Sequence, residues 1–254
     1  MNTRHWSHLA IPIAFAAALI GCSQDGRKGV LEPSTSALAT SGGPIEARVE
    51  IPFDAANFVG AVQNPFLPLV PGTILTYRQE TPDGVETNTV EVTHDTKTIL
   101  GVTTYVVHDQ VFLEGALSED TFDWMAQDTE GNVWYFGEDT KEYENGQVVS
   151  TAGSWEAGVS GEPGILMLAE PEVGLRYKQE DSPDNAEDMA KIVSLCAPVE
   201  VPYGDFECAL VIAEWSLVES GPRDAKYYVS GVGDVLELGQ RGSKQERTEL
   251  IAIN

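Results

Sequence analysis

The feature that most constrains the fold of this chain is the spacing of turn signals within residues 119–149. The segment carries two of them, one across residues 128–132 and one at Asn145-Gly146. Asn-Gly adopts the positive φ angles of a type I′ turn, which joins two antiparallel strands. The residues between the turns are rich in aromatic side chains, which pack well on a pleated, half-buried surface. The sequence therefore predicts an antiparallel meander with one aromatic face.

Most of the remaining chain shows the same pattern. Runs rich in Val, Thr, Ile, Tyr and Leu are bounded by Gly, Pro and Asn, and they lie at residues 73–79, 85–99, 103–113, 186–195 and 207–217. Such runs predict strands rather than helices. Residues 153–171 contain four glycines and two prolines around an apolar run, which predicts a long loop that covers a core edge or closes over a ligand. The predicted fold class is mainly β, a single antiparallel sheet with few or short helices.

The first 22 residues have the features of an export signal. Arg4 precedes an apolar run from residue 9 to residue 20, whose length suits a signal peptide better than a membrane span. The run ends in Leu-Ile-Gly-Cys, with the cysteine at position 22, and this resembles the lipobox of bacterial lipoproteins. The resemblance implies cleavage before Cys22, acylation of that residue and a place in the cell envelope. Ser23, directly after the cysteine, favours the outer membrane; an ordinary cleaved signal is the alternative.

The predicted domain organisation follows from these features. Residues 1–21 form the lipoprotein signal peptide, and residues 22–50, which are rich in Ser, Gly, Ala and Thr, form a flexible tether. Residues 51–254 form a single β-rich domain. Asp and Glu number 40 against 15 Lys and Arg, for a formal charge of −25. So acidic a protein disfavours a nucleic-acid partner, because such partners require Lys and Arg against their phosphates.

Two cysteines remain if Cys22 is acylated, and they predict a disulfide. Cys196 and Cys208 lie twelve residues apart in a chain with an export signal, where oxidation is favoured. A tight turn at Tyr203-Gly204 would set Cys208 opposite a residue near Val199. The bridge therefore requires a bulge or a neighbouring loop.

Two sets of residues are candidate metal ligands. His94 and His108 face each other across a hairpin if its loop has three residues, and paired imidazoles bind transition metals. A second set has a spacing similar to a calcium loop, although its glycine falls at the fourth place and no helices flank it; its members are Asp128, Glu130, Asn132 and Asp139. The alternatives are surface histidines and a turn closed by local hydrogen bonds. The prediction is no cofactor, with Ca²⁺ as the alternative.

Five phrases of the chain together resemble a family of uncharacterised bacterial secreted proteins and lipoproteins. They are NPFLPLVPGT (64–73), FDWMAQDTEGNVWYFGEDTKEY (122–143), SWEAGV (154–159), PYGDF (202–206) and KYYVSGVGDV (226–235). The resemblance implies a shared β fold and transfers no activity. The Pro-x-Gly-x-Phe hairpin also occurs in envelope proteins shaped as an open half-barrel around an apolar pocket. This analogy predicts a strongly curved, half-barrel-like sheet.

The function that follows is a lipid-anchored binding or structural protein of the cell envelope. Its partners are the membrane and an apolar small molecule or envelope protein on the concave face of the sheet. The candidate pocket residues are Phe122, Trp124, Trp134, Phe136, Trp155 and Trp215. One alternative is a calcium-stabilised structural domain. The other is a hydrolase that uses paired carboxylates such as Asp123 and Glu138, although the chain has none of the common hydrolase motifs.

Overall fold

The computed structural model describes residues 47–218, 223–241 and 244–254. The predicted lipidation site Cys22 and the predicted signal peptide lie outside these residues, as does most of the predicted tether. Across the described ranges, no helix is both long enough and apolar enough to cross a membrane.

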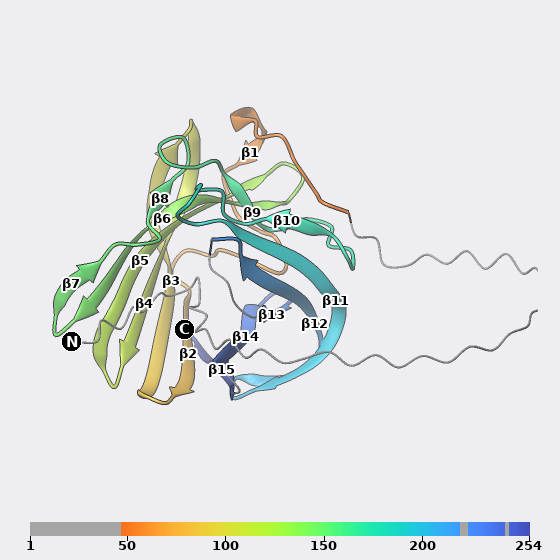
Figure 1. Ribbon diagram of the computed structural model, residues 1–254. Helices are drawn as coiled ribbons and strands as arrows, with labels where there is room; N and C mark the ends of the chain where they lie inside the picture. The colour runs from red at the N-terminus through yellow and green to blue at the C-terminus, as the bar shows by residue number, and fades with distance from the viewer. Residues whose placement is uncertain (1–46, 219–222, 242–243) are drawn as a thin grey trace, which may run out of the picture.

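The described residues form one open antiparallel sheet, which confirms the predicted fold class (Figure 1). One 3-10 helix, Ala55–Asn57, precedes the first strand. The strands are β1 (Phe58–Val59), β2 (Ile74–Thr81), β3 (Gly84–Ile99), β4 (Val102–Leu113), β5 (Ala116–Asp128), β6 (Val133–Glu144), β7 (Gln147–Ser150), β8 (Trp155–Glu156), β9 (Gly164–Met167), β10 (Arg176–Lys178), β11 (Asp188–Val201), β12 (Gly204–Ser216), β13 (Asp224–Val229), β14 (Gly233–Arg241) and β15 (Lys244–Ile253). Their order is β10-β11-β12-β13-β14-β15-β2-β3-β4-β5-β6-β7, with β1 on β5 and with β8 and β9 on β6.

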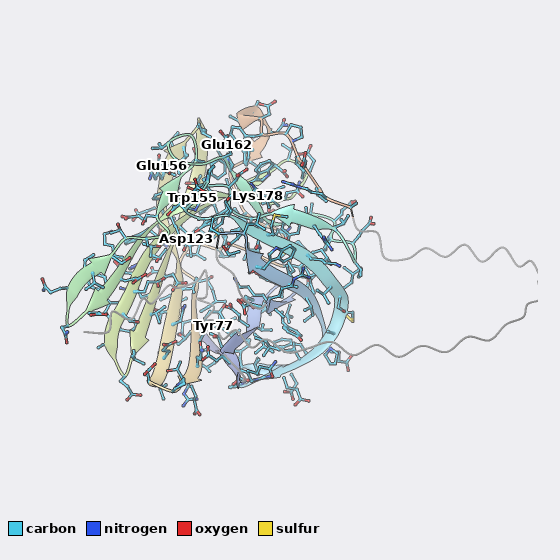
Figure 2. All side chains as sticks on the ribbon, viewed as in Figure 1. Tyr77, Asp123, Trp155, Glu156, Glu162 and Lys178 are labelled. Carbon is cyan, nitrogen blue, oxygen red and sulfur yellow. A yellow bond between two sulfur atoms is a disulfide. The ribbon has the colours of Figure 1, made fainter. Side chains whose placement is uncertain are left out.

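The sheet is strongly curved, so that β3–β6 and β11–β14 form two facing walls (Figure 1). Register shifts interrupt the pairings β3–β4, β5–β6, β11–β12 and β13–β14, among others. A β-bulge bends its strand and increases the local twist, so repeated bulges curve the sheet as a whole. Tyr77 of β2 and Asp123 of β5 lie between the two walls (Figure 2). The concave side of the sheet thus carries polar side chains.

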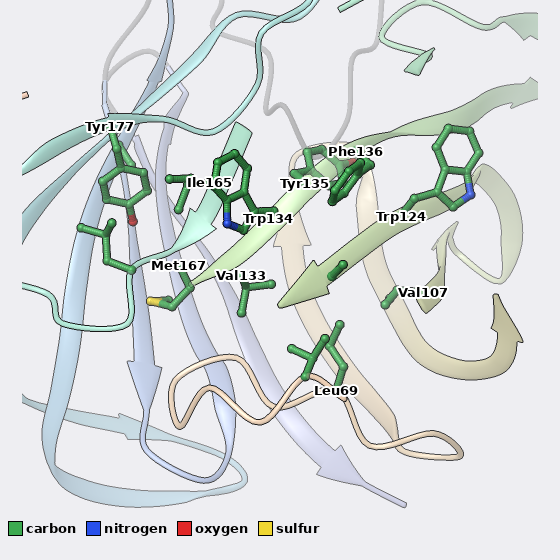
Figure 3. Packing of buried hydrophobic residues seen from close by; sticks show 14 of the residues in the cluster. Leu69, Val107, Trp124, Val133, Trp134, Tyr135, Phe136, Ile165, Met167 and Tyr177 are labelled. Carbon is green, nitrogen blue, oxygen red and sulfur yellow. The ribbon is translucent and has the colours of Figure 1, made fainter. Parts of the chain in front are cut away.

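The main hydrophobic core packs around β6. Phe136 is fully buried, and the rings of Phe53 and Phe58 meet it edge to face at centroid distances of 6.0 and 5.6 Å. Edge-to-face contacts of this kind are favourable beyond the area they bury. Figure 3 shows Trp134 of β6 beside Ile165 of β9, its partner in the sheet. The segment 153–171, predicted as a loop with an apolar section, therefore contributes two short strands to this core.

A second cluster of buried side chains holds the other wall together. Its residues come from β2, β11, β12, β13, β14 and β15 and are Tyr77, Val199, Val201, Ala209, Val229, Val235, Leu236 and Leu250. This cluster connects the last strand of the chain to the first long one, since β15 pairs with β2. The N-terminal and C-terminal parts of the body therefore form one continuous sheet.

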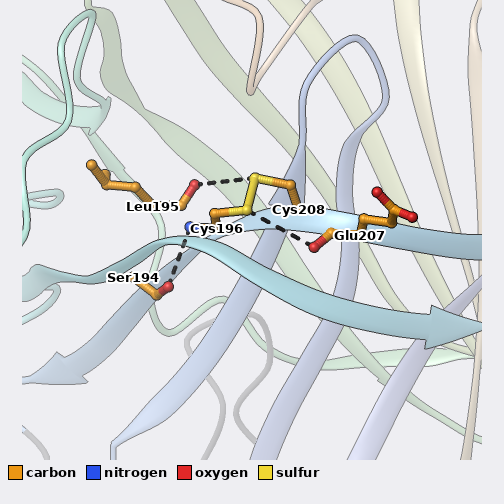
Figure 4. Close-up of a disulfide and its surroundings, with 5 residues drawn as sticks. All are labelled: Ser194, Leu195, Cys196, Glu207 and Cys208. Carbon is orange, nitrogen blue, oxygen red and sulfur yellow. Dashed lines mark hydrogen bonds between the residues drawn. A yellow bond between two sulfur atoms is a disulfide. The ribbon is translucent and has the colours of Figure 1, made fainter.

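The disulfide between Cys196 and Cys208 is present, as predicted (Figure 4). The two cysteines lie on β11 and β12, whose register shifts three times between Ile192 and Val199. These irregularities bring the two Cα atoms to 4.2 Å from each other. The bulge that the sequence required is thus part of the structure.

The hairpin between β3 and β4 differs from the predicted one. Its loop has two residues, Leu100 and Gly101, and both have positive φ angles, of 49° and 83°. These are the angles of a type I′ turn, whose twist matches that of the flanking strands. Ile99 therefore pairs with Val102 rather than with Thr103.

Candidate functional site

A cavity of about 210 Å³ lies on the concave side, between the two walls of the sheet. Engineered cavities of roughly 150 Å³ hold benzene, so this one has room for a small organic molecule. Part of its lining is apolar and comes chiefly from Leu67, Leu69, Val92, Val107, Met125, Leu166 and Val232. The rest contains six carboxyl groups, those of Asp109, Asp123, Glu138, Glu180, Asp234 and Glu237. The cavity is therefore amphipathic rather than purely apolar.

The pleat of the strands explains most of this lining. Successive side chains of a strand point to opposite faces, so every second residue reaches the cavity. The residues that follow this rule are Asn88, Val90 and Val92 of β3, Val107 and Asp109 of β4, and Thr121, Asp123 and Met125 of β5. Polar and apolar residues thus alternate along the chain but share one face.

A bulge in β6 adds a carboxyl group that strict alternation would turn away. Phe136 and Gly137 together oppose a single residue of β5, so Tyr135 and Glu138 both line the cavity although they are three positions apart. Gly137 has a φ of +115°, and a Cβ atom there would collide with the carbonyl group of Trp155. Only glycine fits this position, so Gly137 determines where Glu138 points.

The same device recurs on the opposite wall. In β14 the register shifts by one residue against β13, and Val235, between the paired residues Asp234 and Leu236, is the extra residue. Asp234 and Glu237 therefore both line the cavity at a spacing of three. Two bulges on facing walls each add a second polar group to the site.

Asp123 and Glu138 are direct partners across β5 and β6. The Tyr135 hydroxyl donates a hydrogen bond of 2.5 Å to Asp123 Oδ1, and the Thr140 hydroxyl donates one of 3.0 Å to Glu138 Oε2. Burial raises the pKa of Asp123 to about 6, against the effect of the Tyr135 hydrogen bond. Burial and the charge of Asp123 raise the pKa of Glu138 to about 8. At neutral pH, the pair of carboxyl groups therefore holds one proton between them, with Glu138 the more basic member.

Asp109 and Glu180 are deeply buried carboxyl groups of the lining, with exposed fractions of 6% and 9%. Burial raises the pKa of each well above its ordinary value, and the charges of Asp123 and Glu138 add to this effect for Asp109 and Glu180 respectively. Asp109 Oδ1 and Glu180 Oε2 have no hydrogen-bond partner, and neither does Asn88 Oδ1. Three residues of the cavity lining thus each have a buried oxygen atom without a hydrogen-bond partner, although the Asn88 side chain also lowers the pKa of Asp109 through a hydrogen bond.

Lys226 is the one basic residue that lines the cavity within the described ranges. Its ammonium group lies 2.9 Å from Glu214 Oε2. Burial alone would lower the pKa of Lys226, but Glu214 and Glu237 outweigh burial and hold that pKa well above its ordinary value. Burial also raises the pKa of Asp234 to about 7 and that of Glu237 to about 8. Lys226 is therefore a permanent cation already engaged by a carboxylate.

The aromatic residues predicted for the pocket lie elsewhere, which corrects that prediction. Trp124, Trp134, Phe136 and Trp155 belong to the main core. Phe122 stacks on His108 with ring centroids 4.2 Å apart, and the Arg223 guanidinium lies 4.4 Å from the ring centre of Trp215. The reason is alternation: Phe122 and Trp124 point away from the face that carries Asp123 and Met125.

The two histidines do not form a pair. Because the hairpin loop has two residues and a bulge follows Val92, His108 faces Glu91 rather than His94. His108 Nε2 lies 2.7 Å from Asp120 Oδ1, while the side chain of His94 is exposed. Across the described ranges, no three His, Cys, Asp or Glu side chains are close enough to hold a metal ion.

The predicted calcium ligands form a closed turn instead. The carboxylate of Asp128 accepts three hydrogen bonds of 2.8 Å, from the backbone N–H and the side-chain amide of Asn132 and from the indole N–H of Trp134. Glu130 is exposed, and Asp139 lies in mid-strand, 2.8 Å from Lys141 Nζ. The local hydrogen bonds thus use the oxygen atoms that a calcium site would need.

Sequence reasoning named Asp123 and Glu138, but it missed the other four lining carboxyl groups and Lys226. These residues are spread over four parts of the chain, and only the sheet order brings them together. One signal was available: Asp109 stands between Val107 and Val111, in register with residues that are buried. A carboxyl group at such a position either has a partner or belongs to a site.

The chain is similar to two solved structures. One is a protein inferred to be exported, with a YmcC-like fold, from Bacteroides fragilis; the identity is 15%, the TM-score is 0.42, and the match covers 78% of this chain and 99% of that one. The other is an inferred lipoprotein from Parabacteroides distasonis, with 13% identity, a TM-score of 0.39 and the same coverage. Comparisons with family models and with curated proteins gave no match.

Proposed function

We propose that this chain is an extracytoplasmic binding protein of the bacterial envelope, anchored by acyl chains at Cys22, which holds a small ligand in the cavity of its curved sheet. The observation that carries the proposal is the cavity itself. Its volume of about 210 Å³ is enclosed by two walls of one sheet, and its lining joins an apolar region to unused polar acceptors. Ligand sites have this composition, an apolar surface with a few fixed polar groups.

The amino-terminal features support the cellular part of the proposal. The lipobox-like sequence ending at Cys22 directs acylation, and two or more acyl chains hold a protein on a membrane durably. Ser23 favours the outer membrane, and residues 22–50 give the domain a flexible tether. The disulfide Cys196–Cys208 fits an oxidising compartment. An envelope protein that packs on the concave face of the sheet is the alternative partner.

The binding role is tested on protein isolated from its own host membranes and examined by native mass spectrometry. We expect a small molecule to remain bound to the wild-type chain. Val107→Trp, which fills the cavity, abolishes this binding, whereas Val159→Trp, at a position that is 79% exposed, leaves it intact. A ligand-free mass for the wild-type chain, together with failure to bind any small apolar probe, would show that the protein has a structural role only.

A carboxylate-based hydrolase is the second candidate function, and one observation favours it. Asp123 and Glu138 face each other in the cavity, and at neutral pH one is ionised and the other protonated. A general base and a general acid require this division. The test is hydrolysis of a panel of nitrophenyl glycosides. The hydrolase predicts a bell-shaped profile with limbs near pH 6 and 8, loss of activity in Asp123→Asn and unchanged activity in Glu172→Gln, an exposed carboxylate outside the cavity. No turnover between pH 5 and 9 would eliminate this candidate.

A further inference from the structure

The polar part of the cavity is unbalanced in both charge and hydrogen bonding. Six carboxyl groups line it, and its single cation, Lys226, is already paired with Glu214 at 2.9 Å. A carboxylate is an acceptor and cannot satisfy another carboxylate unless a proton lies between them. Tyr135 and Thr140 donate hydrogen bonds to Asp123 and Glu138, but one oxygen atom of Asp109 and one of Glu180 have no donor from the protein.

Two of these carboxyl groups are more than nine-tenths buried and still have a free oxygen atom. Asp109 is 6% exposed and Glu180 is 9% exposed, and Asp109 Oδ1 and Glu180 Oε2 have no hydrogen-bond partner. Asn88 Oδ1, on the same face of the neighbouring strand as Asp109, is a third unused acceptor. Leaving a buried acceptor unpaired costs about 1–3 kcal/mol, and more when it is charged. Such atoms are expected where a ligand completes the site.

A ligand that fits must bring donors, positive charge and an apolar part. A primary ammonium group has three N–H donors and no acceptor, which matches a wall of carboxyl and amide oxygens. Leu67, Val92, Val107 and Leu166 offer the apolar surface for the rest of the molecule. A bare metal ion fits less well, because the described residues provide no group of three close ligands and the apolar surface would remain empty.

We propose that the cavity selects a small organic ammonium ion with a short apolar tail, and that Asp109 and Glu180 accept its N–H groups. This inference rests on the proposed binding function and names the chemical class of its ligand. The ammonium ion replaces the protons that the buried carboxyl groups hold in the empty cavity. The titratable groups that line the cavity come from several elements of the sheet. They are Tyr77 on β2, Asp109 on β4, Asp123 on β5, Tyr135 and Glu138 on β6, Glu180 after β10, Lys226 and Tyr228 on β13, and Asp234 and Glu237 on β14.

The test compares three probes of equal length and different charge. The full chain in phosphatidylcholine nanodiscs is titrated at pH 8 with hexylammonium, 1-hexanol and hexanoate by calorimetry, and empty nanodiscs give the background. Hexylammonium is expected to bind at a single site at least tenfold more tightly than hexanol, and hexanoate is expected to bind most weakly. The apolar wall is common to all three probes, so the differences report the polar wall alone.

Variants separate the polar wall from general packing. Asp109→Asn and Glu180→Gln keep the size of each side chain and are expected to lower hexylammonium affinity at least tenfold, with hexanol affinity changed less than twofold. Glu172→Gln, which removes an exposed carboxylate outside the cavity, is expected to change neither affinity. Circular dichroism identifies a variant that fails to fold, and in that case the remaining variant decides.

The outcomes distinguish this inference from the proposed function. Equal affinity for hexylammonium and hexanol overturns the ammonium inference and leaves the binding function standing. Tightest binding of hexanoate overturns it in favour of Lys226 as the ligand's partner. Failure of all three probes to bind contradicts both proposals. Tight hexylammonium binding that survives Asp109→Asn and Glu180→Gln assigns the ammonium site to other residues and also overturns the inference as stated.

Discussion

Strand β6 contributes side chains to two different environments, an aromatic core and a cavity lined by carboxyl groups. Phe136 is fully buried, and its ring packs edge to face against those of Phe53 and Phe58. Two residues further on, Glu138 faces a cavity lined by five other carboxyl groups. The aromatic core is built for stability, because each ring fills the space beside the next. The cavity places acids where burial disfavours their charge, which makes it costly to fold and suited to a ligand.

The contrast is largest in the response to pH. The aromatic core around Phe136 is held by contacts between rings, whereas burial raises the pKa of Glu237 and of Glu138 to about 8 and that of Glu119 to about 9. Between pH 5 and 7 these groups are protonated in the folded chain and ionised in the unfolded one. The folded state therefore binds more protons, and stability falls as pH rises, by about 1.4 kcal/mol per pH unit for each such group at most.

We expect the free energy of unfolding of the ligand-free protein to decrease by several kcal/mol from pH 5 to pH 7, as an order of magnitude. Urea unfolding at fixed ionic strength measures it. Glu237→Gln removes one of these groups. We expect it to reduce the dependence of the unfolding free energy on pH by about 1.4 kcal/mol per pH unit at most, which corresponds to one proton. Stability that instead increases over this range would show that the cavity carboxyl groups titrate as exposed ones do.

The aromatic side of the comparison is tested by Phe136→Ala. Truncation of a fully buried phenylalanine removes contacts with Phe53 and Phe58 and leaves a void. We expect a loss of about 3–5 kcal/mol, independent of pH. Tyr203→Ala, at a ring that is 42% exposed in the turn before β12, is the control and is expected to cost less than about 1 kcal/mol. A small loss of stability in Phe136→Ala would mean that neighbouring side chains rearrange to fill the void.

The bulge that separates the two environments is tested by Gly137→Ala. The added Cβ meets the Trp155 carbonyl group and must also adopt a φ near +115°, so β6 loses its pairing with β8 or shifts register. We expect a loss of about 3 kcal/mol. Gly146→Ala is the matched control, because its φ of +73° is also positive but nothing lies within 4 Å of the added atom. Its expected cost is about 1 kcal/mol, and equal costs for the two variants would show that the contact with Trp155 is unimportant.

The sequence predicted the fold better than it predicted the site, and the bulges explain the difference. Alternation and turn residues identify strands such as those around Asn145-Gly146, since these signals are local. The loop at Leu100-Gly101 was misjudged by one residue, and that single step separated His94 from His108. The spacing of three that joins Asp234 to Glu237 in the cavity depends on a register shift that no local pattern announces. The aromatic residues of the same region stand out in the sequence, but the alternation of side chains along the strands points them away from the cavity.

The smallest expected effect is also the most specific to the cavity. Glu180→Gln replaces a buried acid with a neutral side chain of the same size, so the folded state no longer has to protonate it or bear its charge. At pH 8 we expect the variant to be more stable than the wild-type chain by about 1 kcal/mol, and at pH 5 we expect almost no difference, because less of the acid is ionised in the unfolded chain there. Urea unfolding at the two pH values measures this, with Glu172→Gln as the control.

A gain in stability combined with weaker binding of hexylammonium would mean that Glu180 is retained for its ligand at the expense of the fold. A loss of stability at pH 8 would instead place Glu180 among the residues that hold the two walls together.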